Sequence, residues 1–211
     1  MVNSRSICWV SLQELWNWEK CKTRIKDLRG RLGFKENHYL RFLGFKLNLE
    51  DGSIYDELNN YKLIREDNYL SQLYCILYSY AGAKEHTETG KLITSKQLQG
   101  GKFCNVMVNR AKSSITEVFG DCSKCLIECA KFFGGMEVSF SHGDCSISIN
   151  PLPLIPFTIV MYEEDNEFPA SAQIFFDVSI KDYLDLEKAG MLSELVADRL
   201  KQAYQKLYQK N

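Results

Sequence analysis

The chain has 211 residues, of which 45% are apolar and 25% charged, a composition typical of a folded globular protein. Its 26 basic and 27 acidic residues leave a formal net charge of −1, so there is no basic excess with which to bind a nucleic acid. No stretch approaches the roughly 18 consecutive apolar residues of a membrane span, and the N-terminal segment lacks the apolar core of a signal peptide. We therefore expect a cytosolic protein that forms a single domain over residues 1–211, with neither nucleic acid nor membrane among its partners.

The N-terminal part of the chain predicts a helix followed by paired strands. Ser11 begins a capping box for a helix over about 11–28. Residues 39–57 then alternate between apolar and polar as a strand, a turn at Asp51-Gly52 and a returning strand. We expect the first of these strands to bury one face, on which Phe45 lies.

Three helices are predicted in the middle of the chain. Residues 68–82 are apolar almost all round, which is typical of a helix buried inside a domain. A polar loop follows. Residues 103–119 and 122–133 then predict two further helices, the second of which ends at a pair of glycines.

The second half of the chain changes to strands and ends in a helix. A hairpin is expected over 136–149, with its turn at 142–144. Further strands are expected over 157–164 and 172–178, and apolar residues at three- and four-residue spacing predict a helix over about 180–209. Helices, then an antiparallel sheet, then a C-terminal helix predict an α+β fold in which the helices pack on the sheet.

Eight cysteines are present, and three of them lie in the stretch DCSKCLIEC. On a helix, Cys122, Cys125 and Cys129 lie within about 60° of one another on the apolar side, which favours a place in the core. Residues seven apart are about 10 Å apart along a helix axis, too far for all three to bind one zinc ion. Cys122 and Cys125 can share a metal ion, with Cys145 as a further ligand, so a thiol-ligated site stays open as an alternative.

His142 and Asp144 flank a glycine at the expected hairpin turn. Such a triplet is typical of a polar turn, but a rigid loop also presents a histidine well as a ligand or a base. Both interpretations stay open. His142 and Cys145 do not make a credible catalytic pair, because no third group is evident to orient them.

An acidic segment lies between the last two predicted strands. It contains Asp165 and Glu167, and Asp177 lies near the end of the strand that follows. Clustered carboxylates bind hard cations or act as acid and base, but they are equally typical of a solvated loop. The EF-hand spacing is absent, as are the phosphate-binding, nucleophile-elbow and zinc-protease motifs.

The segments LRFLGFKLNLEDGSIYDE and GDCSISINPLPLIPFTIVMYEEDNEFPASAQIFFDV, in this order, resemble the domain-of-unknown-function family numbered 3786 of anaerobic bacteria and archaea. The resemblance covers about residues 40–200. It implies accessory work in anaerobic one-carbon or corrinoid metabolism, beside a corrinoid or iron–sulfur partner protein. Some members carry a small iron–sulfur domain, whose cysteine spacing this chain does not match.

These observations lead to one leading hypothesis and two alternatives. We expect first an accessory protein that binds a small ligand or cofactor, such as a corrinoid or another tetrapyrrole, in a pocket between the sheet and the helices. The residues expected to hold it are His142, Asp144, Asp165, Glu167 and Asp177. The alternatives are a divalent-metal-dependent enzyme that uses the carboxylates near Asp165, and a metal or iron–sulfur protein ligated by thiols. The thiols expected in that last case are Cys122, Cys125 and Cys145.

Overall fold

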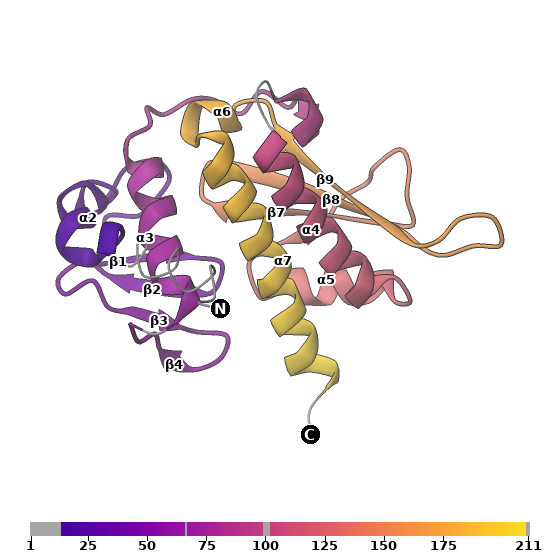
Figure 1. The fold of residues 1–211 in the computed structure, drawn as a ribbon, viewed down its shortest axis with the longest axis horizontal. Coiled ribbons are helices and arrows are strands. Elements are labelled where there is room, and N and C mark those ends of the chain that lie inside the picture. Colours follow the sequence, from indigo (N-terminus) through magenta and orange to yellow (C-terminus); the bar gives the residue numbers. More distant parts are fainter. Residues whose placement is uncertain (1–13, 66, 99–101, 210–211) are drawn as a thin grey trace, which may run out of the picture.

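The computed structural model describes residues 14–65, 67–98 and 102–209. It has an α+β fold with two antiparallel sheets and a long C-terminal helix, so the predicted fold class is confirmed. The strands form two sheets where one was expected, and the C-terminal helix runs between the parts of the molecule that contain them (Figure 1). Within the described residues, no helix is both long enough and apolar enough to cross a bilayer.

The helix predicted over about 11–28 is interrupted, because residues 14–15 are helical, residues 16–17 form a bend, and α2 (Trp18–Lys26) follows. Asn17 caps it, because its side-chain oxygen accepts a hydrogen bond from the Lys20 N–H at 3.2 Å. The predicted cap, Ser11, lies outside the described residues. α2 packs against α3 (Asn68–Ala81), which confirms the helix predicted over almost the same residues.

The N-terminal sheet has four strands in the order β1-β2-β3-β4. The segment 39–49, predicted as one strand, instead turns back at Leu43-Gly44, where the φ angles are 45° and 71°. Two consecutive positive φ angles make the tight turn that hairpins favour. The predicted turn at Asp51-Gly52 is confirmed, and the Asp51 side chain accepts a hydrogen bond from the Ser53 N–H there. The strands are β1 (Tyr39–Phe42), β2 (Phe45–Asn48), β3 (Ile54–Asp56) and β4 (Tyr61–Lys62).

The second sheet has five strands in the order β5-β9-β8-β7-β6. The hairpin predicted over 136–149 is confirmed by the pairing of β6 with β7, but residues 138–144 form a long connection rather than a tight turn. The reason is that Phe140 leaves the ladder and packs on Phe175, with 5.1 Å between the ring centroids. The strands are β5 (Leu92–Ile93), β6 (Met136–Glu137), β7 (Cys145–Leu152), β8 (Ile155–Tyr162) and β9 (Ser171–Asp177).

Helices connect the two sheets. α4 packs on β9, α5 packs on β7, and α7 packs on α4, α5 and α3, so it contacts helices of both parts of the molecule (Figure 1). The helix predicted over 180–209 is divided in two, because Asp185 caps α7 by accepting a hydrogen bond from the Lys188 N–H at 3.0 Å. The helices are α4 (Lys102–Phe119), α5 (Ser123–Lys131), α6 (Ile180–Tyr183) and α7 (Leu186–Tyr208), with a short 3₁₀ turn, η1, at Ser95–Gln97.

A buried ion pair joins α7 to the N-terminal sheet. Arg199 and Asp56 of β3 are both fully buried and share two hydrogen bonds of 2.7 and 2.8 Å. The Arg199 Nε–H also donates to the Leu43 carbonyl oxygen at 3.0 Å, which helps to fix the turn there. Burial raises the pKa of Asp56, but hydrogen bonds from Arg199 and Asn59 outweigh it and hold that pKa below its ordinary value. The pair therefore stays charged near neutral pH.

Candidate functional site

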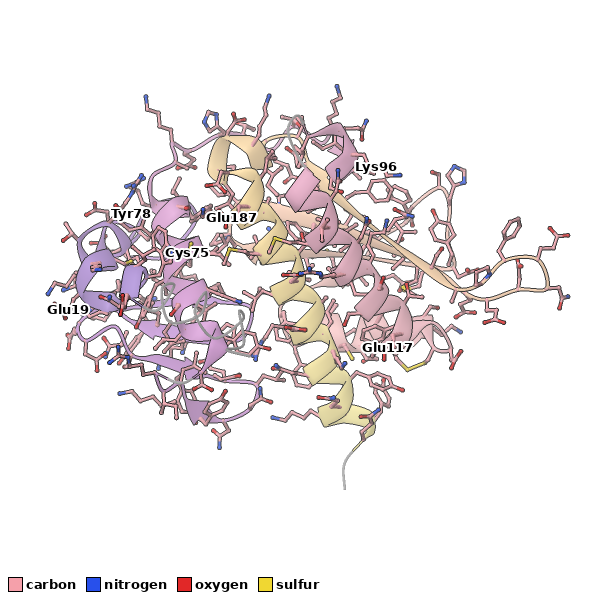
Figure 2. The ribbon with its side chains drawn as sticks, viewed as in Figure 1. Glu19, Cys75, Tyr78, Lys96, Glu117 and Glu187 are labelled. Atoms are coloured by element: carbon pink, nitrogen blue, oxygen red, sulfur yellow. A yellow bond between two sulfur atoms is a disulfide. The ribbon has the colours of Figure 1, made fainter. Side chains whose placement is uncertain are left out.

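A hollow of about 600 Å³ lies between the start of α2 and the first half of α3 and opens to solvent. Its walls include the rings of Trp16, Trp18 and Tyr74 and the side chain of Leu70. Figure 2 labels Glu19, which lines the same hollow from α2, at the edge of the N-terminal part of the molecule. Aromatic rings give a site a large, rigid apolar surface, so these walls suit a flat ligand.

Three separate segments hold the aromatic walls in place. The Trp18 ring lies so close to Gly52, in the β2–β3 turn, that an added Cβ there would be 2.1 Å from the ring. The Tyr74 hydroxyl of α3 donates a hydrogen bond to the Gly52 carbonyl oxygen at 2.7 Å, and its ring centroid is 6.1 Å from that of Trp18. Burial raises the pKa of Tyr74 to about 12, so this hydroxyl remains a donor at neutral pH.

The lining of the hollow carries both signs of charge. Lys20 and Arg65 supply the cations, and Glu14 and Glu19 supply the anions. The Glu19 carboxylate is paired with Lys22 at 2.5 Å, which offsets its charge. Charges of both signs beside aromatic walls favour a flat molecule whose edge carries polar or charged substituents.

The hollow offers aromatic and polar contacts rather than soft metal ligands. None of the residues known to line it is a histidine, a cysteine or a methionine. Over the described ranges 14–65, 67–98 and 102–209, no three His, Cys, Asp or Glu side chains are grouped so that they could hold a metal ion. A metal carried inside a ring ligand would therefore gain no axial histidine, cysteine or methionine from these walls.

Four of the five predicted ligand-binding residues lie on two loops at one end of the five-stranded sheet. His142 and Asp144 belong to the β6–β7 connection, and Asp165 and Glu167 belong to the β8–β9 connection; both loops extend away from the helices in Figure 1. Asp144 joins the loops, because its Oδ2 accepts a hydrogen bond from the Glu163 N–H at 2.7 Å. The side chains of His142 and Glu167 are exposed.

The Asp165 carboxylate is engaged by its own loop. Its Oδ1 accepts hydrogen bonds from the Glu167 N–H at 2.8 Å and the Phe168 N–H at 2.7 Å. These hydrogen bonds hold the pKa of Asp165 below its ordinary value. The arrangement is that of an aspartate that stabilises a turn, which supports the solvated-loop interpretation of the acidic segment.

Asp177 lies at the opposite end of β9 from the other four residues. β9 has seven residues, so its ends are roughly 20 Å apart. The Asp177 side chain is buried and accepts hydrogen bonds from the N–H and hydroxyl of Thr89 and from the Ser179 N–H. Burial raises its pKa, but these hydrogen bonds outweigh that effect and lower it. The structure therefore does not assemble the five predicted residues into one site.

The predicted thiol ligands are divided between a disulfide and the core. Cys122 and Cys125 form a disulfide, with their Cα atoms 5.4 Å apart. Cys122 precedes α5 with φ −151° and ψ 74°, so the helical wheel that placed it on the apolar face does not apply to it. Cys129 is buried, as the wheel predicts. Cys145 is a buried free thiol, and among the described residues it belongs to no group of three potential metal ligands.

The aromatic hollow is a feature that the sequence did not reveal. The available signal was the run Trp16-Asn17-Trp18, in which two large aromatic residues flank a helix cap. The third aromatic wall, Tyr74, and the glycine that supports it, Gly52, come from distant segments. Only the packing of α2 on α3 brings them together, so residue spacing could not indicate the site.

Comparison with known proteins gives a family but no relative of stated function. The model of a family described as Domain of unknown function (DUF3786) matches residues 25–199. No curated protein and no solved structure matches the chain. The matched range includes both sheets and Tyr74, but it leaves out Trp16 and Trp18. Two walls of the hollow thus belong to the part of this chain that lies outside the family model.

Proposed function

This chain belongs to that family, whose description names no activity, and we propose from its geometry that the protein is an accessory protein that binds a small, flat, ring-containing organic molecule. The binding site is the hollow between α2 and α3. The observation that supports this function is the meeting of three aromatic side chains around a hollow of about 600 Å³. That volume lies within the range of about 300–1,000 Å³ that is usual for small-molecule sites.

Tetrapyrroles, including the corrinoids implied by the family resemblance, are one group of flat ligands to consider. The aromatic walls favour stacking on part of such a ring, and the polar and charged residues of the lining favour contacts with its acidic or amide substituents. Because the known walls lack histidine, cysteine and methionine, we propose binding through the ring face and substituents rather than through the central metal. A flavin is also a flat ring molecule with polar substituents. Because it is smaller than a tetrapyrrole, less of its surface would lie outside the hollow. We place this accessory role in the cytosol, as expected from the sequence.

The two metal-dependent alternatives have less support from the geometry. The carboxylate of Asp165 is engaged by backbone N–H groups, and Cys122 is bonded to Cys125. No grouping of three potential ligands within the described residues favours either alternative. We therefore do not develop the carboxylate-dependent enzyme or the thiol-ligated metal protein further.

The proposed function predicts that flat ring ligands stabilise the protein. The purified protein is heated with flavin mononucleotide, cobalamin or haemin, and the midpoint of thermal unfolding is measured. A probe at 100 times its Kd should raise the free energy of unfolding by about 2.7 kcal/mol, which for a chain of this size is a shift of roughly 5–11 °C. Tryptophan emission should also fall, because Trp16 and Trp18 line the hollow.

Two variants locate the binding. Trp16→Ala removes one wall of the hollow and should weaken binding of the stabilising probe about tenfold or more. Phe168→Ala is the matched control, because Phe168 is an exposed aromatic residue on a loop of the other sheet, and it should leave binding unchanged. If none of the three probes stabilises the protein at saturation, or if Trp16→Ala binds as the wild type does, the proposed function is wrong.

A further inference from the structure

Cys122 and Cys125 differ from the other described cysteines in their accessibility. Both are only half-buried, whereas the free thiols are all buried. Among the described residues, the free thiols are Cys21, Cys75, Cys104, Cys129 and Cys145. We propose that Cys122 and Cys125 are a redox-active pair that exchanges two electrons with a low-molecular-weight disulfide.

Burial makes the other described cysteines poor nucleophiles. It raises the pKa of Cys75 and Cys129 to about 12, and the pKa of Cys104 and Cys145 to about 11. Since the thiolate is the form that attacks a disulfide, these four residues react slowly even if a reagent reaches them. Among the described cysteines, thiol–disulfide exchange is therefore expected mainly at Cys122 and Cys125.

The position of the pair at the start of α5 favours a thiolate. Cys122 is the N-cap residue of this nine-residue helix, and Cys125 lies in its first turn. The N–H groups and the dipole of a helix N-terminus stabilise negative charge there. The Glu163 carboxylate lies at the same helix end, where its Oε1 accepts a hydrogen bond from the Ser123 N–H at 3.3 Å. Its negative charge opposes a thiolate on Cys122, so the helix dipole and the other N–H groups of the first turn are the groups that favour one.

Cys122 and Cys125 have different surroundings. Cys122 lines a second hollow, of about 280 Å³, together with Glu117 at the end of α4 and Lys201 and Tyr204 of α7. Cys125 packs instead against the hydrophobic core. Figure 2 shows the disulfide beside Glu117, on the opposite side of the molecule from Glu19. This hollow is therefore separate from the aromatic one, and Cys122 is the sulfur that we assign to the attack.

The bond is not needed to hold the fold together. The disulfide links two cysteines that are three positions apart in the sequence. Closing so short a loop restricts the unfolded chain very little, so the bond stabilises the folded state very little. α5 is also held by packing on β7 and α7 through buried residues such as Leu126 and Ala130. The disulfide can therefore open and close while the surrounding structure stays folded.

The exchange proceeds in two balanced steps. In the reduced protein, the Cys122 thiolate attacks one sulfur of the external disulfide, which breaks its S–S bond, forms a mixed disulfide on Cys122 and releases one thiolate. The Cys125 thiolate then attacks the Cys122 sulfur, which closes the Cys122–Cys125 bond and releases the second thiolate. The two thiolates take up the two protons of the original protein dithiol. Two electrons have passed from the protein to the external disulfide, and an excess of external thiol reverses both steps.

Redox titration of the wild-type protein tests the proposal first. The protein is equilibrated with glutathione buffers from fully reduced to fully oxidised, alkylated and analysed by peptide mass spectrometry. We expect Cys122 and Cys125 to change together from thiols to a disulfide within this range, while far-ultraviolet circular dichroism stays constant. A pair that keeps one state throughout, or a reduction that unfolds the protein, would overturn the proposal.

Single variants test the assignment of the two sulfurs. With oxidised glutathione, Cys125→Ser should accumulate a mixed disulfide on Cys122, and Cys122→Ser should form about tenfold less adduct on Cys125, because that sulfur packs against the core. Equal adducts on both variants, or none on either, would contradict a directional exchange site. A failure here leaves ligand binding at the aromatic hollow unaffected, because the two hollows share no residue.

Discussion

The ion pair between Arg199 and Asp56 is the residue-scale feature that joins the C-terminal helix to the N-terminal sheet. Three N–H groups of Arg199 find acceptors on Asp56 and Leu43, and a further contact reaches Gln202. The guanidinium also lies 4.2 Å from the centre of the Phe45 ring. Both charges are removed from water, so each depends on the other for compensation. Neither residue stands out in the sequence, because they are 143 positions apart.

Breaking this pair should be costly. Asp56→Asn leaves the Arg199 charge buried without its partner, so we expect the free energy of unfolding to fall by about 3–5 kcal/mol. Glu57→Gln is the matched control, because Glu57 pairs with the exposed Arg41 and such surface pairs contribute about 1 kcal/mol or less. Urea unfolding of the two variants measures both values. Equal small losses would show that the buried pair contributes little.

The lowered pKa of Asp177 predicts a loss of stability in acid. A carboxyl whose pKa is lower in the folded state stabilises the protein above its ordinary pKa, near 4, and this contribution is lost as the pH falls through the folded value. Glu194 and Asp198 act in the opposite direction, because burial raises their pKa. The wild type should therefore be compared with Asp177→Asn in urea between pH 6 and about pH 2. The difference in unfolding free energy between the two should shrink as the pH falls, and a constant difference would contradict the assignment.

At the scale of elements, the sequence predicted the helices better than the breaks between strands. The apolar pattern of 68–82 identified α3, because a fully buried helix leaves a continuous signal. The break at Leu43-Gly44 was missed, because a leucine with positive φ is uncommon. Its conformation is supported by the hydrogen bond from Arg199, which comes from the far end of the chain. The pattern of residues near Leu43 gives no information about this contact, so it could not predict the turn.

Gly44 offers a direct test of this turn. A Cβ at Gly44 would lie 3.0 Å from Arg199 Nη2 and 3.1 Å from Phe133, and its φ of +71° disfavours any side chain. Gly90 has nearly the same φ, +70°, but nothing lies within 4 Å of its Cβ position. Gly44→Ala should therefore lower the free energy of unfolding by more than Gly90→Ala, whose cost of about 1 kcal/mol comes from the backbone alone. Equal costs would show that the packing around Arg199 adjusts freely.

At the scale of the whole molecule, the candidate site was the part least accessible to sequence reasoning. The predicted carboxylates were grouped because they are close in sequence, yet Asp165 and Asp177 lie at opposite ends of β9. The opposite holds for the aromatic hollow: Trp18, Gly52 and Tyr74 are far apart in the sequence but lie together in the structure. The α+β class could be predicted from the order of the elements, whereas the site required the packing of three segments.

Hydrogen–deuterium exchange with and without a bound probe tests the central claim most directly. The exchange of backbone amides is compared for the free protein and for the protein saturated in turn with flavin mononucleotide, cobalamin and haemin. The account predicts slower exchange over residues 14–26 and 70–75, which contain the lining residues of the aromatic hollow, with at least one probe. Protection over the loops 138–144 and 163–170 instead, or no protection with any of the three, would contradict it.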